Sequence, residues 1–198
     1  MSEMIENPEN EKWQIVQFDS QILSSFMECP WKMNKKFNEH LVPISGPSTS
    51  ILKGSLAHVG LKTFYQAYKD GKEYKDRVGE ALVSMRAEAP KLNLQPEDCL
   101  LVYRTFEEYA EYRKNDIFQI LGVEQFFRIL VYERFPLKIY VTGRIDLIIQ
   151  EFHNSILAPW DHKSESERWF YSALTNQFRI YAIACKSNSL TVNRFRFQ

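Results

Sequence analysis

Apolar residues recur at helical spacing through most of the first half of the chain. Between Ile51 and Lys69, one stripe consists of Leu52, Leu56, Val59, Phe64 and Tyr68. This three- to four-residue spacing is typical of an amphipathic helix, with Ser50 as its cap and Asp70-Gly71 as its end. Similar patterns predict helices over residues 21–28, 31–41, 74–89 and 96–115, with a loop over residues 43–50.

The pattern changes after Phe118, where β-branched and aromatic residues become frequent. Residues 123–132 and 137–149 are rich in these types, and the short connection between them predicts a β-hairpin. Further strands are expected over residues 155–160 and 190–197, with a helix over residues 167–186 between them. This order predicts one α/β domain over residues 18–198, with a central mixed β-sheet flanked by helices. The acidic, polar start predicts a flexible N-terminal tail over residues 1–17.

Composition narrows the classes of protein that fit. No apolar run approaches the roughly 18 to 20 residues of a membrane span, so no membrane partner is expected. Cys29, Cys99 and Cys185 are far apart and odd in number, which favours a reducing, intracellular (cytoplasmic) setting over a disulfide framework. The 25 basic and 25 acidic residues cancel, which counts against a general nucleic-acid coat but allows phosphate binding in one local cleft.

Candidate chemistry gathers in the second half, where Asp146, Asp161 and Lys163 interrupt or end apolar runs. Residues i and i+2 of a strand share a face, so Asp161 and Lys163 are expected side by side. Counting back around the hairpin places Glu124 roughly opposite Asp146, although a register shift of one residue would turn it away. Carboxylates of this kind suit Mg²⁺ or Mn²⁺. The alternative interpretation of the D-x-K triplet is an ion pair at a strand end.

Three further patterns add to the triplet. Gly54 and His58 lie one helical turn apart, as do Gln177 and Tyr181, and Leu23-x-x-Phe26-x-x-Cys29-Pro30 lies near the start. By themselves, these residues also fit ordinary packed or solvent-facing helix positions. As an ordered set with Glu124, Gly143-Arg144-Ile145-Asp146 and Asp161-x-Lys163, they resemble the RecB-like nuclease domain of the PD-(D/E)xK superfamily, from about Phe18 to the C-terminus.

The resemblance implies a restriction-endonuclease-like core with a helical N-terminal portion. It also implies roles for individual residues. Asp146, Asp161 and Lys163 would be catalytic, and the metal ligands would be His58, Glu124, Asp146 and Asp161. The substrate-binding residues would be Arg144, Gln177, Arg179 and Tyr181. Lys32, Lys35, Lys36 and Arg168 are further candidates for phosphate contacts, although they equally fit solvated helix faces.

The sequence departs from some relatives of this family. Cys29 occupies the first cysteine position of the relatives that hold an iron–sulfur cluster, but their C-terminal cysteine trio is absent. We therefore predict no iron–sulfur cluster. The sequence also stops after Gln198, where such relatives continue, which leaves a C-terminal truncation open.

Two functions follow from the resemblance. The first is a Mg²⁺- or Mn²⁺-dependent DNA nuclease, with exonuclease activity expected, acting on single strands or duplex ends in recombination, repair, phage or CRISPR-related processing. A helicase or another DNA-processing protein would be its partner. The alternative is a catalytically weak, nuclease-like DNA- or protein-binding subunit of a larger complex. A third interpretation is a globular α/β domain with chance motifs.

Overall fold

Two strands, a run of helices, three strands, a helix and a last strand follow one another along the described chain, and they form two separate clusters of contacts. The structure is a computed structural model that describes residues 2–6, 12–42, 44–152, 157–162, 172–187 and 196–197. Unit 1 comprises Met1–Ile44, Phe126–Arg144 and Trp169–Thr191, and unit 2 comprises Ser45–Gln125, Ile145–Arg168 and Val192–Gln198. The sequence predicted one domain over residues 18–198.

The elements of unit 1 are β1 (Ser2–Glu6), β2 (Lys12–Phe18), α1 (Ser20–Glu28), α2 (Pro30–Met33), the π-helix η1 (Asn34–Asn38) and α6 (Ser172–Ser187). Those of unit 2 are α3 (Thr49–Lys69), α4 (Tyr74–Leu92), α5 (Pro96–Tyr112), β5 (Leu157–Asp161) and β6 (Arg196–Phe197). The hairpin strands β3 (Phe118–Arg134) and β4 (Leu137–Glu151) contribute to both units.

Residues 2–6 and 12–18 of unit 1 form strands, where the sequence predicted a flexible tail over residues 1–17. β1 pairs with β2 in antiparallel fashion, and β2 runs parallel to the first part of β4, with Val16 opposite Ile139. Ile15 is buried in the core. Polar composition alone did not indicate these strands, because backbone hydrogen bonds to a distant strand hold the segment in place.

Local signals set the ends of the helices in unit 1. The Asp19 carboxylate accepts a hydrogen bond from the Ile22 backbone N–H at 2.8 Å and thereby caps the first turn of α1. The helix ends at Glu28, and Pro30 begins α2, since proline is tolerated in the first turn of a helix. The following turn is a π-helix rather than the continuous α-helix that the spacing predicted.

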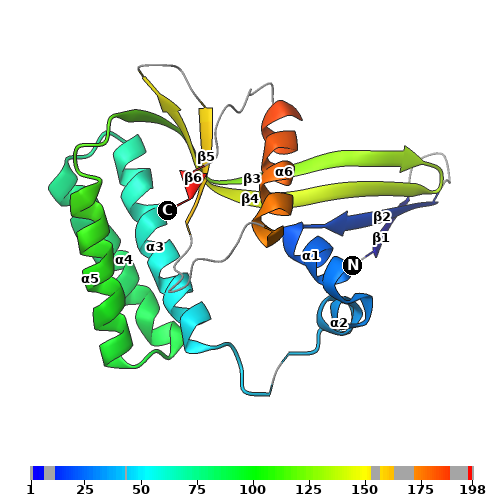
Figure 1. The fold of residues 1–198 in the computed structure, drawn as a ribbon, viewed down its shortest axis with the longest axis horizontal. Helices are drawn as coiled ribbons and strands as arrows, with labels where there is room; N and C mark the ends of the chain where they lie inside the picture. Colours follow the sequence, from blue (N-terminus) through cyan, green and yellow to red (C-terminus); the bar gives the residue numbers. More distant parts are fainter. Residues whose placement is uncertain are drawn as a thin grey trace. The chain divides into compact units, whose positions relative to one another are not determined.

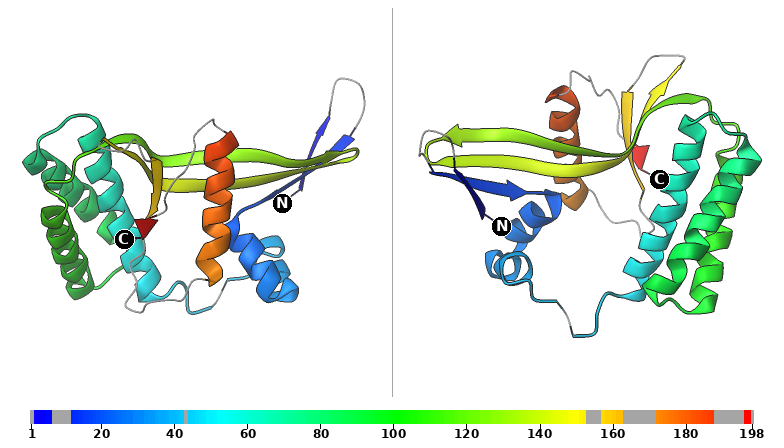
Figure 2. Two further views of the ribbon diagram at one scale, coloured as in Figure 1. Left: turned by 45° about the horizontal axis from the view of Figure 1, so that its top comes forward. Right: turned by 180° about the vertical axis from the view of Figure 1, so that it is seen from behind.

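Helices α3, α4 and α5 pack side by side in unit 2 (Figures 1 and 2). Phe64, Met85 and Phe106 lie in their common core. Gly60 allows the close approach, because a Cβ at this position would collide with the Met85 sulfur and lie 3.3 Å from Phe106. The α3 helix begins at Thr49 with Ser48 as its cap, two residues before the predicted start.

The sheet residues of unit 2 complete this core. The second part of β4 is antiparallel to β5, and β5 runs parallel to β6. Leu147, Ile149 and Trp160 project into the core and are fully buried. Among the described residues, the strands pair in the order β1-β2-β4-β5-β6, with β3 also on β4. A mixed sheet flanked by helices confirms the predicted fold class.

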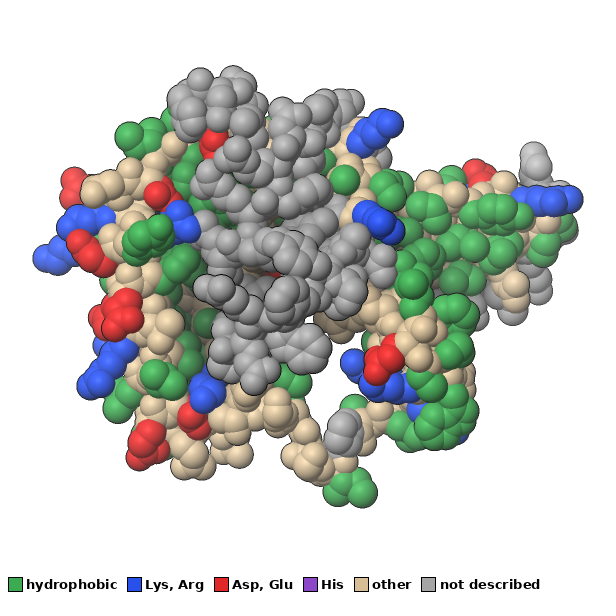
Figure 3. All heavy atoms as spheres, in the orientation of Figure 1, with side chains coloured by type: hydrophobic (Ala, Val, Ile, Leu, Met, Phe, Trp, Pro, Cys, Tyr) green, Lys and Arg blue, Asp and Glu red, His purple; other side chains and the backbone are tan. Residues whose placement is uncertain are grey.

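The surface mixes charge with apolar side chains. Acidic and basic residues alternate over the helices of unit 2, whereas apolar side chains cover much of the distal part of the β3–β4 hairpin (Figure 3). Leu130, Val131 and Tyr132 are among the exposed residues there. In the part of the chain that the structure describes, no helix is both long enough and apolar enough to cross a bilayer.

Candidate metal centre

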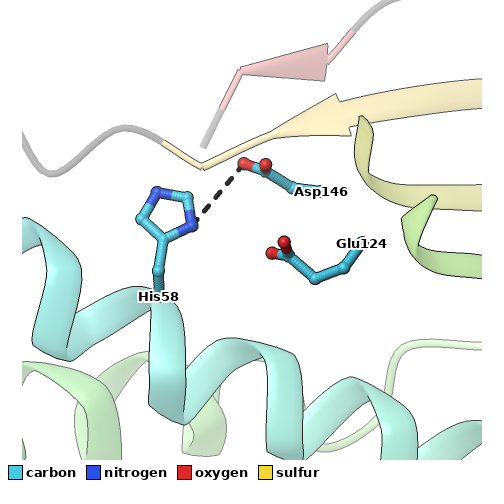
Figure 4. A group of neighbouring side chains, drawn as sticks. All are labelled: His58, Glu124 and Asp146. Atoms are coloured by element: carbon cyan, nitrogen blue, oxygen red, sulfur yellow. Dashed lines mark ion pairs between the residues drawn. The ribbon is translucent and has the colours of Figure 1, made fainter. Parts of the chain in front are cut away.

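Three side chains from distant parts of the sequence meet in unit 2. His58 comes from α3, Glu124 from β3 and Asp146 from β4 (Figure 4). Each offers one nitrogen or oxygen atom, and these atoms all lie within 4.8 Å of one another. The His58 Nδ1 and Asp146 Oδ2 atoms are 3.8 Å apart. The structure therefore brings together three of the four side chains that the resemblance implied as metal ligands.

Glu124 lies at an irregular point of β3. Its φ of 51° is in the left-handed region, which costs a non-glycine residue about 1 kcal/mol or more. Residues 118, 120 and 122 are buried before it, whereas residue 127 is buried after it, so the alternation shifts by one. Both observations indicate a β-bulge, a feature that re-aims side chains beside active sites. Simple counting around the hairpin could not foresee this extra residue.

Asp146 is more enclosed than His58, with 14% of its side chain exposed against 38% for His58. Its Oδ2 atom accepts a hydrogen bond from the His162 backbone N–H at 2.9 Å. Burial raises the pKa of Asp146, and the negative charges of Asp161 and Glu124 raise it further. The His162 hydrogen bond and His58 act in the opposite direction and favour the ionised form.

Asp161 is the last residue of β5 and is 2% exposed. Because its charge acts on the pKa of Asp146, its carboxylate contributes to the field at the same group. Lys163, the third predicted catalytic residue, lies outside the described residues, as does Arg168. The expected neighbourhood of Asp161 and Lys163 therefore stays a prediction.

The donor set fits a divalent cation. Carboxylate oxygens are the ligands that Mg²⁺ and Mn²⁺ prefer, and an imidazole nitrogen is compatible with Mn²⁺. Opposite ligands around such an ion are separated by about 4.2 Å, twice the metal–oxygen distance of about 2.1 Å. Ligand atoms within 4.8 Å of one another need only a small inward movement to reach that spacing. A cation would also relieve the repulsion between the carboxylates.

Gln177 and Tyr181 form a hydrogen-bonded pair in unit 1. The Gln177 side-chain amide donates to the Tyr181 hydroxyl at 2.7 Å, and this hydroxyl donates to the backbone carbonyl of Arg144 at 3.0 Å. The Tyr181 and Phe127 rings meet edge to face at 6.1 Å. A Cβ at Gly143 would lie 2.5 Å from the Phe127 ring, which explains the glycine. This cluster holds the β4 backbone two residues before Asp146.

The remaining predicted residues are also placed. Arg144 and Arg179 are exposed on β4 and α6. His162, the middle residue of the D-x-K triplet, was not among the predicted site residues. It is 5% exposed and stacks on Tyr65. The only signal for it was its position between Asp161 and Lys163, two residues after the apolar segment Leu157–Trp160.

A model of the PD-(D/E)XK nuclease superfamily matches residues 20–196, which is most of the chain. The protein therefore belongs to this superfamily and has the fold of a nuclease. Nucleases of this superfamily use divalent metal ions, in agreement with the acidic group around Asp146. A search among curated proteins returned no match.

Proposed function

We propose that this protein is a RecB-like nuclease that hydrolyses phosphodiester bonds in DNA with Mg²⁺ or Mn²⁺. The observation that carries the proposal is the convergence of His58, Glu124 and Asp146 in a chain of the PD-(D/E)XK superfamily. These residues come from three separate elements. A purely structural role gives no reason to gather two carboxylates at a partly buried position, where their like charges repel.

In the proposed site, Asp146 and Asp161 hold the metal with His58, and Glu124 completes the acidic side. A divalent ion held by these residues would supply a Lewis acid for the phosphoryl oxygen and for the attacking water. Lys163 follows Asp161 by two residues. We assign to its ammonium group the role of stabilising the negative charge that develops on the phosphate during attack.

Binding of DNA is assigned to groups that belong to unit 1. Arg144 and Arg179 are exposed and positively charged, and Gln177 and Tyr181 lie on the same helix as Arg179. The lysines of α2 and η1 are further candidates. Lys32 and Lys35 form ion pairs with Glu28 and Glu39, each four residues away in the sequence. Such pairs contribute little to stability, so a phosphate can replace the carboxylate partner at small cost.

Cleavage of end-labelled single- and double-stranded DNA, with Mg²⁺, Mn²⁺ or EDTA, tests the proposal. Asp146→Asn, Asp161→Asn and Lys163→Ala are each expected to lower the rate at least about 100-fold. Glu133→Gln, on the exposed tip of the hairpin, serves as a matched control and is expected to be as active as the wild type. Full activity of Lys163→Ala would contradict the assignment of a catalytic role to Lys163.

The same preparations separate the finer alternatives. Cleavage of linear but not circular DNA supports an exonuclease, and cleavage of both supports an endonuclease. Titration calorimetry with Mn²⁺ addresses the second candidate function, a nuclease-like binding subunit, which the zero net charge favours. Absence of Mn²⁺ binding together with tight DNA binding would support that subunit. Stimulation by a helicase would support the proposed partner.

A further inference from the structure

His162 occupies an aromatic environment that the proposed chemistry does not use. Its ring stacks on Tyr65, with the centroids 5.5 Å apart and the planes 12° from parallel. Tyr109 and Trp160 approach the same ring edge to face at 6.2 and 6.5 Å. We call Tyr65, Tyr109 and Trp160 the aromatic box. Aromatic contacts of this kind have preferred geometries, so the box restricts where the imidazole can lie.

The backbone of the same residue touches the candidate metal centre, since the His162 N–H donates to the Asp146 Oδ2 atom at 2.9 Å. Among the described residues, the strand pairs end before this amide. The pairing of β5 with β4 ends at Trp160 opposite Leu147, and the pairing with β6 ends at Asp161. The packing of the His162 side chain on Tyr65 fixes the residue whose amide is directed at Asp146.

Helix α3 links the box to the candidate ligand His58. Tyr65 follows His58 by seven residues, which places both on one face of the helix. Tyr65 is 2% exposed, and its hydroxyl is hydrogen-bonded to that of Tyr109, so the stacking surface is fixed. The rings of His58 and His162 approach edge to face at 6.4 Å. One helix face thus carries both the candidate ligand and the residue on which His162 rests.

We propose that His162 is a positioning residue, whose ring docks on Tyr65 and thereby fixes the amide that orients the Asp146 carboxylate toward His58 and Glu124. The group of ligand atoms around Asp146 includes His58 and does not include His162 among the described residues. His162 therefore acts through Asp146. Its consequence for metal binding rests on the proposed function, whereas its effect on the Asp146 hydrogen bond does not.

Two substitutions separate the effect of an aromatic ring at residue 162 from the effect of the imidazole nitrogens. His162→Phe keeps a flat aromatic ring for Tyr65, whereas His162→Ala removes the stack and leaves the backbone donor free to move. In metal-free protein, we expect the protection of the residue 162 amide against hydrogen exchange to fall about tenfold or more in His162→Ala and to persist in His162→Phe. Loss of an interaction that orients a metal ligand typically lowers affinity 10–100-fold, so Mn²⁺ affinity should follow the same order.

A general loss of stability would not give this pattern. Phe106→Leu weakens the core of unit 2 between the helices and serves as the destabilised control, for which unchanged Mn²⁺ affinity is expected. Tyr65→Leu removes the stack from its other side. It should reproduce the effects of His162→Ala, and the double variant should show less than the sum of both. This variant also provides the test if His162→Ala does not fold.

Each result decides one question. Equal amide protection in wild type, His162→Ala and Tyr65→Leu would overturn the positioning role. Equal Mn²⁺ affinity in these proteins would overturn its consequence for the metal. If wild-type protein does not bind Mn²⁺ at all, the proposed function fails, while the exchange experiment still decides whether His162 holds Asp146.

Discussion

Replacement of Asp146 by asparagine is expected to stabilise the metal-free protein. The Asp146 and Glu124 ligand oxygens lie within 4.8 Å of each other. Two like charges at that distance repel by about 1 kcal/mol in water and about 3.5 kcal/mol at an effective dielectric constant of 20. Asparagine has the same shape, carries no charge, and its amide oxygen still accepts the His162 N–H. Because His58 offsets part of the repulsion, we expect a net gain of about 1–2 kcal/mol.

The gain should depend on pH in a defined direction. The pKa of Asp146 is raised above its ordinary value of 3.8, chiefly by burial, so the folded state favours the protonated acid. The stability from this protonation is complete below pH 3.8 and is lost as the pH rises through the raised pKa. The advantage of Asp146→Asn should therefore be largest at neutral pH and shrink as the medium is acidified.

Urea unfolding in EDTA at several pH values between 7.5 and 4 measures the difference in unfolding free energy between the variant and the wild type. In thermal unfolding, 1–2 kcal/mol corresponds to a shift of about 2–8 °C in Tm for a chain of this size. Mn²⁺ at about 100 times the wild-type Kd should stabilise the wild type by about 2.7 kcal/mol, and a variant that binds about 100-fold more weakly by only about 0.4 kcal/mol, which reverses their order. Asp98→Asn is the control of opposite sign, since Asp98 faces Lys53 at 3.1 Å. An Asp146→Asn protein that is no more stable than wild type in EDTA would refute the reasoning.

Two further predictions concern packing and support. Gly60→Ala should destabilise by about 1–3 kcal/mol, because its methyl group collides with Met85, whereas Gly79→Ala on α4 meets nothing within 4 Å and should stabilise by about 0.5–1 kcal/mol in the same unfolding assay. Equal effects of the two substitutions would contradict the packing argument. Tyr181→Phe should cost about 1–2 kcal/mol, because the Arg144 carbonyl loses its donor and the Gln177 amide loses its acceptor. Unchanged thermal stability would show that this hydrogen-bonded pair does not support β4.

The helices and the hairpin could be read from the sequence because their signals are local. Asp19 caps α1, and the apolar stripe on α3 and the β-branched run in β4 each belong to one continuous segment. β2 was missed for the opposite reason. Its order comes from pairing with β4, which lies more than a hundred residues away in the sequence.

The candidate site also has a part that local sequence indicates and a part that depends on the fold. Residue types and their order were enough to indicate His58, Glu124 and Asp146 as candidates, since the chemistry of carboxylates and imidazole does not depend on the fold. Their convergence depends on a left-handed residue in β3 and on the face of α3, which spacing alone does not specify. His162 could not be identified from the sequence, because its proposed role depends on Tyr65 lying against its ring.

Residue types and their order were sufficient to indicate the class of this protein, a mixed α/β nuclease of the PD-(D/E)XK superfamily, and a set of candidate metal ligands. The tertiary structure decided which of them meet and in what environment. Short-range periodicity specifies elements, because each turn of a helix or step of a strand repeats locally. The field at Asp146 arises from groups on α3, β3 and β5, whose separation in space no local pattern records.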